Sequence, residues 1–128
     1  MLGFSTPVPP ACMAGLGLEN HDIPDSSITA SSDNSNYKAN EGRLHQHGGW
    51  LARKDDIHQW FQVDFGNWTK VTGVATQGNW LPGNVNRDAW ITKFKLAYSY
   101  DGVFFSDYKE DGNNAKVPLL ILAKHFFI

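Results

Sequence analysis

Residues 88–101 alternate between two sets of side chains with a period of two. One side carries Trp90, Thr92, Phe94, Leu96, Tyr98 and Tyr100, and the other carries Ile91, Lys93, Lys95, Ala97 and Ser99. A β-strand places successive side chains on opposite faces, whereas a helix would scatter these aromatic residues around its circumference. The pattern therefore predicts a strand with one apolar face and one solvated face. Asp101-Gly102 then predicts a tight hairpin turn into residues 103–105.

Three further strands are predicted upstream. Residues 57–65 alternate with large side chains on both faces, which is typical of a central strand in a two-layer β structure, and Gly66-Asn67 ends that run. Residues 70–77 are rich in Val and Thr and predict the next strand, while residues 27–32 predict the first. Between these strands, residues 78–87 contain Gly, Pro and Asn, so they predict a long exposed loop with Trp80 and Leu81 near its tip.

Length and composition limit the class of protein. The chain has 128 residues, of which 41% are hydrophobic and 13% aromatic, as expected for one domain with its own core. A net charge of -2 and a pI near 6.2 argue against a nucleic-acid partner, which would require a basic face. No apolar run is long enough to predict a transmembrane segment, and residues 1–11 lack the basic and apolar regions of a secretion signal.

Candidate catalytic and metal-binding residues do not form a recognisable set. Residues 19–22 (ENHD) offer oxygen ligands for Ca²⁺, although a polar turn has the same composition. His45 and His47 would share one face of a strand, as in some zinc sites, but no further ligand follows at metal-binding spacing. No GxSxG or comparable nucleophile motif is present. The residues therefore predict a non-enzymatic protein without a cofactor, in which Ca²⁺ is the one metal left open.

Five separated segments resemble the discoidin domain family, also called coagulation factor V/VIII type C. They are residues 16–32 (LGLENHDIPDSSITASS), 42–44 (GRL), 49–66 (GWLARKDDIHQWFQVDFG), 71–78 (VTGVATQG) and 91–102 (ITKFKLAYSYDG). They occur in the family's order and spacing. The resemblance implies an all-β fold, a jelly-roll β-sandwich or distorted barrel of the galactose-binding-like type. It also implies a non-enzymatic module whose loops at one end bind phospholipid headgroups, collagen, glycans or growth factors.

The resemblance divides the chain into three parts. Residues 1–11 are expected to be a disordered lead-in, residues 12–112 the discoidin domain, and residues 113–128 a divergent apolar tail, which would leave the sandwich incomplete at its C-terminal end. The tail is compatible with a divergent strand pair or with an unrelated terminus. The resemblance further implies that Cys12 is half of a disulfide whose partner is absent from this chain, although a lone cysteine is otherwise a small buried hydrophobe.

The ligand-binding residues are expected in three loops, residues 33–40, 53–56 and 79–88. An apolar pair buried within so long a loop as 79–88 would leave the loop's backbone groups without water, so Trp80 and Leu81 are expected to meet a ligand. The alternatives are that Trp80 closes the barrel mouth and that Tyr37 folds back onto the sandwich. The candidate residues are Tyr37, Lys38, Arg53, Lys54, Asn79, Trp80, Leu81 and Arg87. The resemblance also implies that Leu44 packs inward, and Trp50 is expected in the core.

The favoured function is an extracellular, secreted or cell-surface module of a larger protein, acting in cell adhesion or matrix recognition with a protein partner such as collagen. One alternative is carbohydrate binding, in which Trp80 stacks on a sugar and one of three asparagines hydrogen-bonds its hydroxyls, namely Asn79, Asn84 or Asn86. Another alternative is the binding of anionic phospholipid. In that case the loop tips would enter the membrane interface, while Arg53, Lys54 and Arg87 would contact the headgroups.

Overall fold

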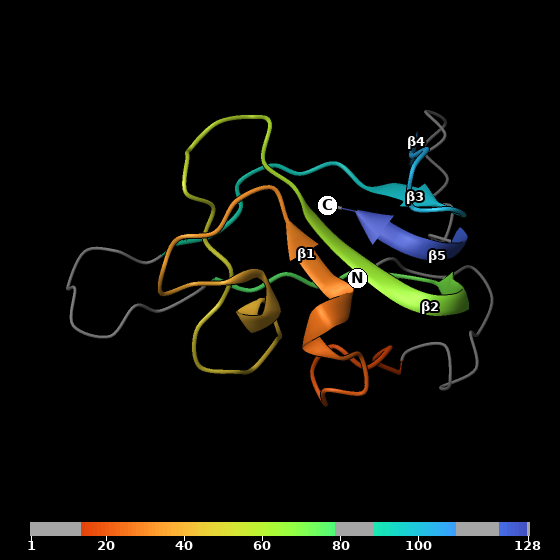
Figure 1. The fold of residues 1–128 in the computed structure, drawn as a ribbon, viewed down its shortest axis with the longest axis horizontal. Coiled ribbons are helices and arrows are strands. Elements are labelled where there is room, and N and C mark those ends of the chain that lie inside the picture. Colours follow the sequence, from red (N-terminus) through yellow and green to blue (C-terminus); the bar gives the residue numbers. More distant parts are fainter. Residues whose placement is uncertain (1–13, 79–88, 110–120, 128) are drawn as a thin grey trace, which may run out of the picture.

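A computed structural model describes residues 14–78, 89–109 and 121–127, and for residues 121–127 only the backbone. Its strands form one antiparallel five-stranded sheet in the order β1-β2-β5-β3-β4 (Figure 1). The strands are β1 (Ile28–Ala30), β2 (Phe61–Val71), β3 (Ala97–Ser99), β4 (Ser106–Asp107) and β5 (Ile121–Phe127). Two short 3-10 helices, η2 (Asp25–Ser27) and η3 (Ala39–Glu41), precede and follow β1.

The last strand lies in the middle of the sheet. β5 pairs with β2 through Val63↔Phe126 and with β3 through Tyr98↔Phe126. In Figure 1 the blue β5 accordingly runs between the green β2 and the teal β3. Residues 121–127 of the apolar tail thus form a central strand. The domain boundary at residue 112 stays a prediction.

The main core lies where β1 meets β2, in the register Ile28↔Val63. Its buried residues are Ile23, Ile28, Ala39, Phe61 and Val63, and Leu18, Ala30, Trp50 and Phe65 pack against them half-buried. Gly42 touches this core closely, since a Cβ there would lie 2.7 Å from Phe61 Cε2. Trp50, which was expected in the core, packs against the core but is only half-buried. Its ring centroid lies 5.6 Å from that of Phe61.

The first strand exists but covers only Ile28–Ala30 of the predicted residues 27–32, and the predicted bounds of the next two strands are wrong. Residues 57–60 precede β2, and Ile57 is 93% exposed, because Asp56 Oδ1 accepts the His58 N–H at 2.8 Å and forms a turn there. Gly66-Asn67 does not end the strand. β2 bulges between Asp64 and Thr69, and pairing with β5 then resumes as far as Val71. Residues 72–78 consequently continue without strand structure.

The strand predicted over residues 88–101 is much shorter, and its faces are reversed. β3 covers only Ala97–Ser99, and Ala97 (4% exposed) and Ser99 (1%) are its buried positions. Trp90, Phe94 and Tyr100, expected in the core, are exposed. Burial of a serine is tolerated because its Oγ donates to Asp101 Oδ1 at 3.0 Å and accepts the Gly102 N–H at 2.9 Å.

The hairpin after β3 exists, but the connection is longer than predicted. Gly102 has the expected positive φ of 75°, yet Tyr98 pairs with Ser106, so residues 100–105 form the connection. Asp101 Oδ1 accepts the N–H groups of Val103 (2.8 Å) and Phe104 (3.0 Å). The carboxylate thus fixes the loop backbone beneath two exposed apolar side chains.

This loop is expected to lose order in acid. The N–H groups of Phe104 and Val103 hold the pKa of Asp101 below its ordinary value of 3.8. A lowered folded-state pKa means that the stabilisation is complete above pH 3.8 and is lost as pH falls through the folded-state value. Amide hydrogen exchange at Val103 and Phe104 should therefore accelerate below that pH. Asp101→Ala, which removes the acceptor oxygen, should show fast exchange at neutral pH, and unchanged protection in that variant would contradict the carboxylate's role.

Candidate functional site

The segments after β1 and before β2 are joined into one unit, here called the loop end (residues 31–40 and 50–60). The Asn34 N–H donates to Leu51 O at 2.8 Å, and the Leu51 N–H donates to Tyr37 O at 3.2 Å. Asn34 and Tyr37 also form an isolated antiparallel bridge. These contacts give loop residues a fixed backbone, as recognition sites on loops require.

The base of the loop end is anchored to the start of β2. The Ser31 N–H donates to Trp60 O at 2.9 Å, and the Trp60 N–H donates back to Ser31 Oγ at 2.9 Å. Ser31 and Ser32 hydroxyls both donate to Gln59 Oε1, at 2.9 and 2.6 Å. Trp50 Nε1 donates to Ser32 O at 2.9 Å, which connects this base to the core.

Four of the predicted ligand residues lie on this unit. Tyr37 is half-buried, whereas Lys38, Arg53 and Lys54 are exposed. The Arg53 N–H donates to Ser32 Oγ at 3.1 Å and its Nε to Asp33 O at 3.3 Å, so Arg53 leans toward the segment that carries Tyr37. This half-burial is compatible with both alternatives left by the sequence, a ring that meets a ligand and a ring that folds back onto the sandwich.

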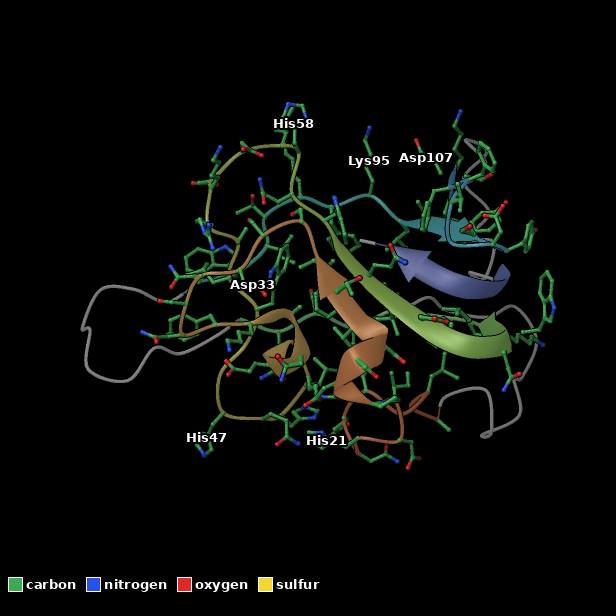
Figure 2. All side chains as sticks on the ribbon, in the orientation of Figure 1. His21, Asp33, His47, His58, Lys95 and Asp107 are labelled. Atoms are coloured by element: carbon green, nitrogen blue, oxygen red, sulfur yellow. The ribbon has the colours of Figure 1, made fainter. Side chains whose placement is uncertain are left out.

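Carboxylates accompany these cations. Asp33, labelled among the loops in Figure 2, has a buried Oδ1 without a hydrogen-bond partner among the described residues. The Gln59 amide and the His58 backbone N–H lower the pKa of Asp56, which stays ionised at neutral pH. The loop end therefore presents charges of both signs around a partly exposed tyrosine.

The other predicted residues fall outside the described ranges. Asn79, Trp80, Leu81 and Arg87 are among them, as is Cys12. Among the described residues, Gly78 and Trp90 lie close together, because a Cβ on Gly78 would lie 3.7 Å from Trp90 Cβ. The binding roles of those residues remain predictions.

The side chains considered as metal ligands form contacts with one another. Asn20 Nδ2 donates to Asp22 Oδ2 at 2.7 Å, and Glu19 Oε1 lies 2.7 Å from His45 Nδ1. His45 has a φ of 57° and lies in a turn, so His45 and His47 do not share a strand face as predicted. Within the described part of the chain, no three His, Cys, Asp or Glu side chains gather at one point.

Comparison with known proteins identifies the family. The profile of the F5/8 type C domain matches residues 27–121. The chain belongs to this family.

Rat (Rattus norvegicus) lactadherin is 37% identical over 113 residues, covering 80% of this chain and 26% of lactadherin. Human neuropilin-1 is 35% identical over 101 residues, covering 77% of this chain and 11% of neuropilin-1. Pig (Sus scrofa) coagulation factor VIII is 34% identical over 110 residues, covering 80% of this chain and 5% of factor VIII. The chain thus spans about a quarter or less of the length of these relatives.

Membership confirms the predicted fold class and the predicted absence of catalysis. F5/8 type C domains are β-sandwiches that act as non-enzymatic binding modules of extracellular proteins. The described strands of this domain supply one antiparallel sheet, open at β1 and β4. No helix within the described ranges has the length and apolarity needed to cross a membrane.

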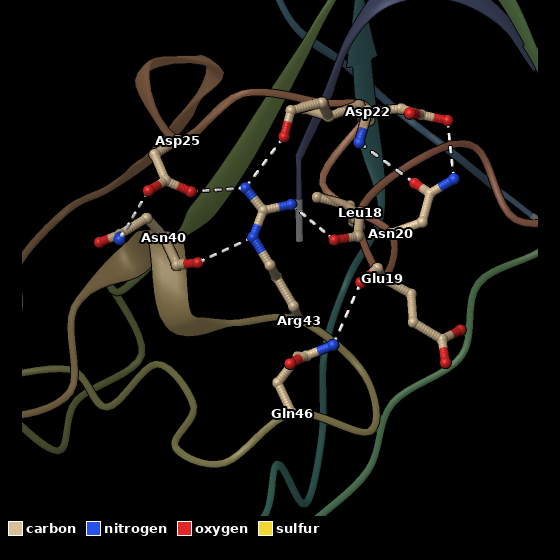
Figure 3. Close-up of polar contacts among 9 residues, drawn as sticks. Leu18, Glu19, Asn20, Asp22, Asp25, Asn40, Arg43 and Gln46 are labelled. Atoms are coloured by element: carbon tan, nitrogen blue, oxygen red, sulfur yellow. Dashed lines mark hydrogen bonds and ion pairs between the residues drawn. The ribbon is translucent and has the colours of Figure 1, made fainter.

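One residue that organises the F5/8 type C domain was not predicted from the sequence. Arg43 is buried (5% exposed) and donates to the backbone oxygens of Ile23 (2.9 Å) and Asn40 (3.1 Å), and also to Leu18 O (Figure 3). Its NH2 also pairs with Asp25 Oδ1 at 2.7 Å. Leu44, implied to pack inward, is only half-buried, whereas its neighbour Arg43 is buried. The resemblance of residues 42–44 (GRL) was the available signal, although it pointed to the leucine.

Proposed function

We propose that this F5/8 type C domain is an extracellular adhesion or matrix-recognition module that binds a protein partner, such as collagen, through its loop end. The observation that carries the proposal is the hydrogen-bonded connection between the segments bearing Tyr37 and Arg53. It holds an aromatic ring and cationic side chains on one fixed framework before any ligand arrives. Such preorganisation lowers the entropy cost of association.

The chemistry of the loop end favours a protein over the two alternatives. Tyr and Arg are the residue types that dominate binding energy at protein interfaces. Lys38, Arg53 and Lys54 lie beside Asp33, Asp55 and Asp56, all in the same pair of loops. Charges of both signs complement a protein surface, which also carries both, and they repel as well as attract an anionic bilayer. A neutral sugar carries no charge that would complement the cations Lys38, Arg53 and Lys54.

Binding of the whole chain to immobilised collagen should weaken when the loop end is altered. Tyr37→Ala and Arg53→Ala are each expected to raise the Kd by about 10-fold or more, since interface anchors contribute about 2 kcal/mol. Surface plasmon resonance would measure the change. Lys70→Ala is the matched control, because Lys70 is exposed and lies near the end of β2 that is remote from residues 50–60.

The same variants distinguish the alternatives. Collagen binding that is insensitive to Tyr37→Ala and Arg53→Ala would refute the loop end as the protein site. Binding to phosphatidylserine vesicles without collagen binding would favour the phospholipid alternative. Competition by simple sugars at the loop end would favour the carbohydrate alternative.

A further inference from the structure

The β2 bulge contains the only Asn-x-Ser/Thr triplet of the chain, Asn67-Trp68-Thr69. Such a triplet is the acceptor sequence for N-linked glycosylation, in which an oligosaccharide is attached to the asparagine side chain. None of the other asparagines is followed two residues later by serine or threonine. Because short triplets also arise by chance, the structure around Asn67 decides whether this one fits a modified residue.

Asn67 lies where β2 departs from regular strand pairing. In the register with β5, residues 65–68 lie opposite the single residue Lys124. Asp64 Oδ1 accepts the Gly66 N–H at 2.7 Å, and Gly66 takes a φ of 71°, so the chain turns just before Asn67. A bulge bends the strand and leaves its extra residues unpaired in the ladder. The acceptor asparagine is thus placed on a kinked segment instead of within a continuous ladder.

The Asn67 side chain has room for a large substituent. It is exposed, and a Cβ placed on the preceding Gly66 would meet nothing within 4 Å. Thr69 Oγ1 donates to the backbone oxygen of Asn67 at 3.0 Å, and the Asn67 amide itself has no hydrogen-bond partner among the described residues. A glycan is bulky and its hydroxyls need water, so it requires such an exposed position.

We propose that Asn67 carries an N-linked oligosaccharide. The inference rests on the extracellular location in the proposed function, because the transferase that recognises the triplet acts on chains entering the secretory pathway. The Asn67 side-chain nitrogen bonds to C1 of the first sugar of a lipid-linked oligosaccharide diphosphate. The C1–O bond to the diphosphate breaks, the lipid diphosphate leaves with the electron pair, and the amide nitrogen loses one proton to a basic group of the transferase.

The glycan would lie away from the loop end. Residues 50–60 lead into β2 at Phe61, whereas Asn67 belongs to the second half of the strand. In Figure 1 the arrowhead of the green β2 points away from the yellow-green segment that precedes the strand. A bulky group at Asn67 therefore leaves the loop end accessible to collagen, while it keeps large partners off the bulged half of β2.

The full chain, fused to a cleavable secretion signal, would be translated with endoplasmic-reticulum microsomes. Most chains that enter the microsomes should gain the mass of one oligosaccharide above the 14.3 kDa polypeptide. Peptide N-glycosidase should remove that mass and convert Asn67 to aspartate, which mass spectrometry of the peptide would locate. Because transfer to an entering chain precedes folding, the result does not depend on the stability of a variant. Microsome-protected chains that stay unmodified at Asn67 would overturn the proposal.

Variants of the triplet identify the groups that the transfer requires. Asn67→Gln and Thr69→Val should each abolish the mass gain, whereas Thr69→Ser keeps the hydroxyl and should retain the glycan. Asn36→Gln is the matched control, because Asn36 is exposed but is followed by Tyr37 and Lys38. A mass gain that survives Asn67→Gln would place the oligosaccharide elsewhere and overturn the assignment.

Collagen binding tests the proposed function separately. The chain secreted from cultured eukaryotic cells should bind collagen with the same Kd before and after glycosidase treatment. A glycosylated chain that does not bind collagen would refute the proposed function and leave the glycan at Asn67 established. An unmodified secreted chain that binds collagen would have the opposite meaning.

Discussion

Replacing Arg43 with alanine is expected to lower the free energy of unfolding by about 3–5 kcal/mol. The side chain is buried, with 1% of it exposed, and its guanidinium donates to three backbone carbonyl groups, two from residues 18–23 and one from Asn40. Alanine would leave these oxygens unpaired and open a cavity beside the core. Urea denaturation followed by tryptophan fluorescence would measure the loss, which is a large share of the stability of a typical domain.

Two substitutions separate the guanidinium fork from its charge. Arg43→Lys keeps the charge but cannot reach all the carbonyl groups at once, so most of the destabilisation should remain. Asp25→Asn removes only the exposed end of the ion pair, so its effect should be much smaller. In Arg43→Ala the pKa of Asp25, which the Arg43 hydrogen bond now lowers, should move back toward 3.8. A variant as stable as the parent chain would show that water replaces the guanidinium without cost.

Arg43 also shows where sequence reasoning was limited. An arginine in a polar turn is ordinarily solvated, because burial of an isolated charge costs several kcal/mol. Burial becomes possible only when oxygen atoms from elsewhere in the chain converge on it. Leu18 and Ile23 supply such oxygens here, and their positions depend on how residues 17–23 fold. No local pattern around residue 43 contains that information.

The sheet shows which features the alternation of apolar and polar side chains can predict and which it cannot. Alternation predicted a strand through residues 61–65, but with large side chains on both faces it did not indicate that Phe61 and Val63 would be the buried positions. The side chains of residues 97–99 do alternate between two faces. The pattern did not reveal, however, that the face with Ala97 and Ser99 would be the buried one. Gly66-Asn67 was interpreted as a strand end because turns and bulges use the same residues. The difference depends on β5, which pairs from the far end of the sequence.

The sequence predicted which residues the loops contain, but it predicted only part of how those loops are arranged. Tyr37, Lys38, Arg53 and Lys54 are on the connected segments as expected, since polar excursions between strands tend to meet at the ends of a sheet. The contacts that connect them are backbone hydrogen bonds between Asn34, Tyr37 and Leu51. Backbone groups are the same in every residue, so the sequence could not indicate which of them would pair.

Replacing Phe61 with alanine is expected to cost about 3–5 kcal/mol of unfolding free energy, as removal of a buried aromatic ring generally does. The ring lies in the core between Trp50 and the backbone at Gly42, and its loss leaves a cavity that neither can readily fill. Urea denaturation would again provide the value. Ile57→Ala is the matched control, because Ile57 is 93% exposed and its truncation should change stability by less than about 0.5 kcal/mol.

The contact between Phe61 and Gly42 allows a sharper test of the same packing. Gly42→Ala alone should destabilise the domain by about 1–3 kcal/mol, because the new methyl group would overlap the ring. In a Phe61→Leu background the same substitution should cost clearly less, since the overlapping ring atoms are gone. Equal costs in both backgrounds would mean that the ring does not limit the space at Gly42. Because Trp50 packs on Phe61 and its Nε1 bonds Ser32, Phe61→Ala should also accelerate amide exchange at Leu51 and Arg53, which would connect the core directly to the loop end.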